Sequence, residues 1–125
     1  MSYKRKIEFK EKYVQVDIGG EVDIQSELET WKKIRKECEK HKCYNVLGIT
    51  IKNTNPFGVL EAYEYPKILE EAGIDSKYRI VWVNEDSEVY KLGKLAVIVM
   101  RNHGVDYSCQ TFPNVSDAKK WLLEK

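Results

Sequence analysis

The chain has 125 residues, of which 42% are hydrophobic and 33% are charged, and 21 basic and 20 acidic residues give it a formal net charge of +1. This length and composition fit one globular domain and exclude a disordered chain. The balanced charge does not favour general binding to nucleic acid or to an anionic membrane. The longest wholly apolar run, residues 95–100, is far too short to span a bilayer.

The N-terminal segment favours β-structure. Residues 3–12 place apolar side chains among charges, and residues 13–18 alternate in part before Gly19 and Gly20 interrupt the pattern. These residues form either one bent strand or a tight antiparallel pair, and the pattern leaves both alternatives open. The local excess of lysine is typical of an edge strand that resists pairing with other chains.

The middle of the chain alternates helix and strand. Residues 23–42, or 26–42, carry apolar side chains at three- and four-residue steps opposite a face of Glu and Lys, which predicts a helix. The nearly continuous apolar run 44–51 predicts a buried parallel strand. Residues 59–72 favour helix, but Pro66 predicts that this helix is broken into two short pieces.

The last part of the chain repeats the alternation. A strand is predicted over 78–83, a helix over 87–102, a strand over 106–112 and a helix capped by Ser116. The complete order, β(β)αβαβαβα, predicts one α/β domain over residues 1–125. Its sheet is expected to be mixed but mostly parallel, with four to five strands and about four helices.

Three segments of the second half carry a family resemblance: residues 74–83, residues 102–105 and residues 116–122. Together with the element order, they resemble the STAS-like superfamily, in particular its small SpoIIAA-like bacterial branch. The anti-sigma-factor antagonists of that superfamily carry a phosphorylatable serine in an Asp-x-Ser-Gly motif after the third strand. The matching loop here, 53–58, has a threonine and a glycine but neither that aspartate nor that serine. Thr54 is therefore only a weak substitute, and its phosphorylation stays open.

The cysteines and histidines do not form a catalytic or metal-binding pattern. An odd count of three cysteines, Cys38, Cys43 and Cys109, is typical of a reducing compartment and predicts a cytoplasmic protein. Cys38, His41 and Cys43 lie close in sequence, but no second pair of ligands follows, so we predict no metal and no cofactor. No serine lies in a nucleophile elbow, and the chain is predicted not to be an enzyme.

Polar side chains follow the two strands predicted over 44–51 and 78–83. In an open α/β sheet, ligands bind where parallel strands reach their carboxyl ends. The predicted ligand- or partner-binding residues are Asn53, Thr54, Asn55, Gly58, Asn84, Glu85, Asp86 and Ser87. The competing explanation is that these residues only cap helices and complete loops.

The sequence therefore predicts a non-enzymatic binding or regulatory domain that contacts an unidentified protein partner or a small ligand through these loops. A first alternative is a small enzyme in the same crevice, with His103, Glu85 or Asp86 as a titratable group of strongly shifted pKa. A second alternative is a homodimeric structural module, in which helix 87–102 buries its additional apolar surface against a second copy.

Overall fold

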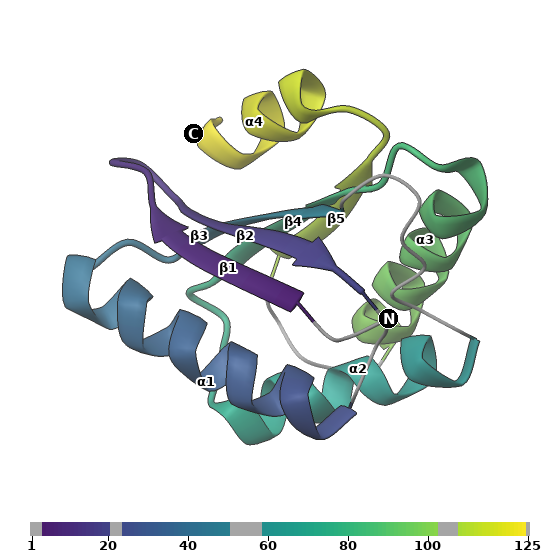
Figure 1. The fold of residues 1–125 in the computed structure, drawn as a ribbon, viewed down its shortest axis with the longest axis horizontal. Helices are drawn as coiled ribbons and strands as arrows, with labels where there is room; N and C mark the ends of the chain where they lie inside the picture. The colour runs from purple at the N-terminus through teal and green to yellow at the C-terminus, as the bar shows by residue number, and fades with distance from the viewer. Residues whose placement is uncertain (1–3, 21–23, 51–58, 103–107, 125) are drawn as a thin grey trace.

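A five-stranded sheet in the order β1-β2-β3-β4-β5 lies between two layers of helices (Figure 1). The computed structural model describes residues 4–20, 24–50, 59–102 and 108–124, with the backbone alone for 59–62. The strands are β1 (Lys4–Phe9), β2 (Val14–Gly19), β3 (Asn45–Thr50), β4 (Arg79–Val83) and β5 (Ser108–Phe112). The helices are α1 (Ile24–His41), α2 (Val59–Ala72), α3 (Ser87–Asn102) and α4 (Val115–Leu123).

The α/β class and the element order are confirmed. The strand pairs β2–β3, β3–β4 and β4–β5 are parallel, whereas β1 is antiparallel to β2, so the sheet is mixed. The two alternatives for the N-terminal segment are also settled. It forms an antiparallel pair, joined by a turn in which the Lys10 N–H donates to the Tyr13 carbonyl at 2.8 Å.

Because successive side chains along a strand point to opposite faces, the hydrophobic core is divided into two parts, one on each face of the sheet. Helices α1, α2 and α3 cover one face of the sheet, and α4 covers the other (Figure 1). Side chains of β2, β3 and β4 on the first face pack under α1, α2 and α3, and the alternate side chains of β3 and β4 pack against α4. The first face includes Val14, Val16, Ile18, Val46, Ile80 and Trp82. The second face includes Leu47, Val81 and Val83, against which α4 packs Ala118 and Leu122.

The prediction of two helical pieces around Pro66 is wrong, because α2 runs unbroken through this residue. A proline inside a helix removes one backbone hydrogen bond and costs about 3 kcal/mol or more. Here the second half of the helix is buried, and tertiary packing supplies most of the stability of a helix in a protein. The buried side chains are Tyr65, Ile68, Leu69 and Ala72.

The start of α4 also differs from the prediction. Ser116 lies within the first turn, and Asn114 is the N-cap, since its Oδ1 accepts from the Asp117 N–H at 2.8 Å. Asn and Ser are about equally suitable caps, so residue type alone does not show that Asn114, two residues before the predicted Ser116, takes this role. The other end of α4 is held by Arg79, whose Nη2 donates to the Trp121 carbonyl at 2.6 Å.

Several groups that ionise at high pH are buried in their neutral forms. Burial raises the pKa of Cys38 from 9.0 to about 12 and that of Cys109 to about 11. It also raises the pKa of Tyr78, whose buried hydroxyl has no hydrogen-bond partner among the described residues. The unfolded chain can ionise these groups at lower pH than the folded protein can.

We therefore expect the free energy of unfolding to be insensitive to these groups below pH 9 and to fall as the pH rises above it. Urea unfolding midpoints test this when they are measured from neutral pH up to about 11, the pKa of Cys109 in the folded protein. Cys38→Ala should weaken the dependence, while Ser116→Ala, at an exposed side chain that does not ionise in this range, should leave it unchanged. A midpoint that stays constant with pH in the wild-type protein would contradict the expectation.

Candidate functional site

A row of buried polar side chains joins the carboxyl ends of β3, β4 and β5. The Thr50 hydroxyl donates to Asn84 Oδ1 at 2.6 Å, and Asn84 Nδ2 donates to Thr111 Oγ1 at 3.1 Å. The Asn84 backbone N–H donates to the Phe112 carbonyl at 3.0 Å. Asn84 is completely buried, and Thr50 and Thr111 are nearly so. The single amide of Asn84 therefore holds three neighbouring segments at one edge of the sheet.

The strand period explains why these residues meet. Thr50 follows Val46 and Gly48 on the face that α1, α2 and α3 cover. Asn84 follows Ile80 and Trp82 on the same face. Polar side chains there are shielded from water, so they need partners inside the protein. The register of β3, β4 and β5 brings the partners together.

Gly93 of α3 allows the helix to cover this polar row. A Cβ at this position would lie 2.7 Å from Asn84 Nδ2 and 3.2 Å from Thr111 Oγ1. Glycine inside a helix costs about 1 kcal/mol relative to alanine, so its presence in α3 needs a structural reason. The close approach of the helix to the Asn84 amide is that reason.

The structure separates Asn84 from the three predicted site residues that follow it. The side chain of Asn84 lies inside the protein, whereas Glu85, Asp86 and Ser87 are exposed. Asp86 caps α3, because its Oδ1 accepts from the backbone N–H groups of Glu88 at 2.9 Å and Val89 at 3.2 Å. The capping explanation thus accounts for Asp86, and a binding role of these residues stays a prediction.

The other half of the predicted site lies outside the described residues. Asn53, Thr54, Asn55 and Gly58 all belong to this part of the chain, as does His103. The phosphorylation of Thr54 therefore also stays open.

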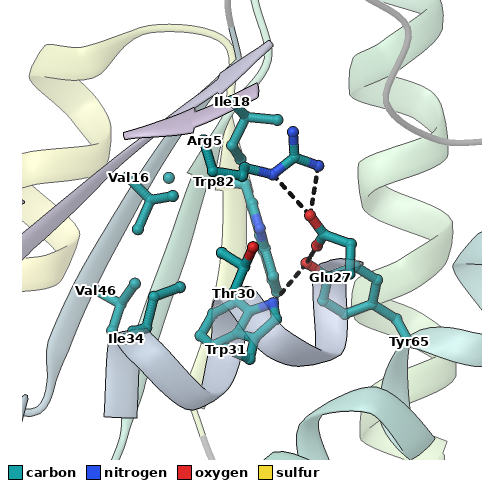
Figure 2. A pocket seen from close by; sticks show the side chains of 11 residues that line it. Arg5, Val16, Ile18, Glu27, Thr30, Trp31, Ile34, Val46, Tyr65 and Trp82 are labelled. Carbon is teal, nitrogen blue, oxygen red and sulfur yellow. Dashed lines mark hydrogen bonds and ion pairs between the residues drawn. The ribbon is translucent and has the colours of Figure 1, made fainter. Parts of the chain in front are cut away.

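A second buried polar cluster, which the sequence did not reveal, lies between the sheet, α1 and α2 (Figure 2). Arg5 reaches from β1 and donates through Nε to Glu27 Oε1 at 2.7 Å, and its Nη2 contacts the same oxygen. The Tyr65 hydroxyl donates to Glu27 Oε2 at 2.7 Å and accepts from Trp31 Nε1 at 2.8 Å. Both charged side chains are 5% exposed, so the cluster is an ion pair inside the protein.

The cavity beside this cluster is too small for a metabolite. It is lined by apolar side chains of the sheet and α1, together with the cluster itself (Figure 2). Only about 10 Å³ is open to the centre of a water molecule, which is room for about one water. Burial, followed by the charge of Glu27, raises the pKa of Tyr65, so its hydroxyl stays neutral and donates to the carboxylate. This arrangement fastens β1 and α2 to α1.

Among the described residues, the cysteines do not gather into a metal-binding group. Cys38 and Cys109 are buried, and their raised pKa values keep them as neutral thiols, the form that is not nucleophilic. His41 stacks on Phe9 with ring centroids 3.9 Å apart. Within the described ranges, no group of three His, Cys, Asp or Glu side chains could hold a metal ion.

The chain matches no protein-family model, and no curated protein matches it significantly in sequence. None of the helices in the described part of the chain has both the length and the apolar character needed to cross a membrane.

We expect Asn84→Ala to lower the free energy of unfolding by about 1–3 kcal/mol, because two buried hydroxyls lose their partner. Gly93→Ala should cost about as much, because its methyl group would collide with the Asn84 amide. The double variant should lose less free energy of unfolding than the two single variants lose together, since truncating Asn84 makes room for the methyl group.

Urea denaturation of the four proteins in this cycle measures the coupling between the two positions. Glu85→Ala, the neighbouring exposed residue, is the control and should change stability by no more than about 0.5 kcal/mol. Strictly additive losses would show that Gly93 and Asn84 do not depend on each other.

For the buried ion pair, Glu27→Leu should cost about 3–5 kcal/mol, because it leaves the Arg5 guanidinium buried without its carboxylate. Arg5→Met combined with Glu27→Leu should recover part of this loss. The matched control is Glu29→Leu, which removes an exposed pair with Lys32 on the same helix and should cost at most about 1 kcal/mol. Equal losses for Glu27→Leu and Glu29→Leu would argue against the importance of the buried pair.

Proposed function

We propose that the chain is a non-enzymatic binding or regulatory domain that contacts its partner at the edge where β3, β4 and β5 end. The observation that carries this proposal is the buried bridge from Thr50 through Asn84 to Thr111. It fixes the ends of three strands, and with the Asp86 cap it fixes the start of α3. A contact surface that is rigid before binding loses little conformational entropy on association.

The geometry favours a protein partner over a small ligand. At the proposed edge, the described residues Glu85, Asp86, Ser87 and Glu88 are exposed and include three carboxylates. An exposed acidic surface suits a partner that presents basic side chains.

The narrower assignment to the STAS-like superfamily, in its small SpoIIAA-like branch, is part of this proposal. It rests on the three segments of the second half and is compatible with the order in which strands and helices alternate from β2 to α4. A regulatory role in the cytoplasm follows from the same resemblance and from the odd number of thiols.

The alternative of an enzyme at the same edge has less support. Two of its three candidate groups, Glu85 and Asp86, are exposed, which suits a contact surface better than an enclosed catalytic centre. The alternative of a homodimer through α3 concerns a different face of the molecule.

Site-specific photocrosslinking in the cells that make the protein tests the proposed edge. A photoreactive amino acid at position 85 or 87 should give a discrete adduct with another protein, because these side chains are exposed beside the fixed strand ends. The same group at position 36, an exposed site on α1, is the control and should not give that adduct.

Charge reversal separates a specific contact from chance proximity. With the photoreactive group at position 87, Glu85→Lys together with Glu88→Lys should greatly reduce the adduct if a basic partner binds there. Failure to obtain an adduct at either edge position, or the same adducts at position 36, would refute the proposal.

A further inference from the structure

The outward face of α3 presents an apolar side chain among cations. Ile98 is 54% exposed, which is high for a large hydrophobic side chain, and Lys91, Lys94 and Arg101 are exposed around it. The other apolar residues of this helix are largely absorbed by the protein's own core, since Leu92 and Leu95 pack against it. Ile98 therefore remains as an apolar surface without a cover inside the described chain.

A surface groove runs along this face between α3 and β5. Lys94, Ile98 and Arg101 line it from α3, Val97 also contributes to its wall, and Gln110 lines it from β5. Lys94 and Arg101 lie seven residues apart, or about 10 Å along a helix that rises 1.5 Å per residue. Two cations thus stand on either side of Ile98 along one groove.

These two cations have no acidic partner in the described part of the chain. Some charged side chains on helix surfaces are paired, as Arg35 is with Glu39 at 3.3 Å and His41 is with Glu37 at 3.3 Å. Neither Lys94 nor Arg101 lies within ion-pair distance of a described carboxylate, and Lys94 approaches only the Tyr90 ring, at 5.5 Å from its centroid. Their charges are available to an acidic ligand.

The free edge of β5 is poorly suited to pairing with an added strand. The Phe112 carbonyl accepts from Asn84, so it points to β4, and the adjacent Thr111 N–H points to the opposite side. Gln110 Oε1 already accepts from this Thr111 N–H at 3.1 Å. A side chain that occupies an edge N–H discourages the addition of a strand. We therefore expect a ligand in this groove to contact the side chains that line it and not the backbone of β5.

A second copy of the chain is also a poor occupant. Symmetric packing of this face on itself would bring Lys91, Lys94 and Arg101 against the same three cations of the second copy. Like charges at an interface oppose association. Charge complementarity favours a partner with the opposite sign.

We propose that the groove between α3 and β5 binds an acidic segment of a partner protein, in which an apolar side chain packs on Ile98 between two carboxylates that pair with Lys94 and Arg101. In an extended segment, alternate side chains share a face and residues advance about 3.3 Å each, so carboxylates four positions apart, with the apolar residue midway, face the groove together about 13 Å apart. The long, flexible side chains of Lys94 and Arg101 span the difference from their backbone separation of about 10 Å. This surface is separate from the edge at Glu85–Ser87, and either proposal can fail without the other.

Selection from a random peptide library displayed on phage tests the proposal with the complete chain as bait. The selected peptides should share two Asp or Glu residues about four positions apart with an apolar residue midway between them. A synthetic peptide of the most enriched sequence, measured by fluorescence polarisation, should bind the double variant Lys94→Glu/Arg101→Glu at least ~10-fold more weakly than the wild type, because two attractions become repulsions. Ile98→Ser should also weaken binding.

The matched control is Lys33→Glu/Lys40→Glu, which reverses two exposed cations with the same spacing on α1 and should leave binding of the peptide unchanged. Circular dichroism of each variant checks that the fold is intact. Enrichment of peptides without acidic residues, failure to enrich any peptide, or equal effects of the two double variants would overturn the proposal. Sedimentation that shows a dimer abolished by Ile98→Ser would also overturn it, in favour of a second copy.

Discussion

The amide of Asn84 is the contact on which the edge of the sheet depends. A parallel sheet covered by helices leaves little access to water at the ends of its strands, so each polar side chain there requires a partner in a neighbouring strand. Asn84 satisfies this requirement on both sides at once, with one hydroxyl from β3 and one from β5. The Asn84 side chain has an NH2 group with two N–H donors and one carbonyl acceptor. This one amide therefore helps to fix the register of three strands and the position of α3.

The buried pair of Arg5 and Glu27 solves a different problem. Strand β1 is at the edge of the sheet, antiparallel to the rest, and its solvent-facing side chains are largely charged. Transfer of two charges out of water is unfavourable, and their attraction compensates only when the geometry is good. The additional hydrogen bond from Tyr65 improves that geometry and connects α2 to the same carboxylate. The ion pair thus attaches the edge strand β1 at a specific position, although keeping two charges in the core is itself unfavourable.

Much of the fold was predictable because it depends on short-range patterns. The period of apolar residues gave α1 and α3 nearly to the residue, and the β-branched runs gave β3 and β4. The errors arose where tertiary packing overrides local preference. Pro66 argues against a continuous helix locally, but the burial of the turns that follow it outweighs the lost hydrogen bond. The cap of α4 is Asn114 and not the predicted Ser116, and a single hydrogen bond identifies it.

The candidate sites were less predictable than the fold. The rule that ligands bind where parallel strands end directed attention to Asn84, which directly follows β4, but the direction of its side chain was not anticipated. Because side chains alternate along a strand, the positions of Ile80 and Trp82 would have placed the Asn84 side chain on the face that α1, α2 and α3 cover. Similarly, Glu27 lies on the same helical stripe as Trp31, which marks it as a buried carboxylate. Its partner Arg5 is 22 residues away in the chain, and no local pattern identifies it.

The asymmetry of the two helical layers has a consequence for motion. Three helices cover one face of the sheet, and of the described helices α4 alone packs on the other (Figure 1). Its attachment consists of a small apolar contact and of Arg79, whose guanidinium lies 3.9 Å from the centre of the Trp121 ring. Detachment of this nine-residue helix would uncover Leu47, Val81 and Val83 while the larger core stayed intact. Because fewer buried side chains hold α4 than hold the three helices on the other face, we expect local opening of the protein to begin at α4.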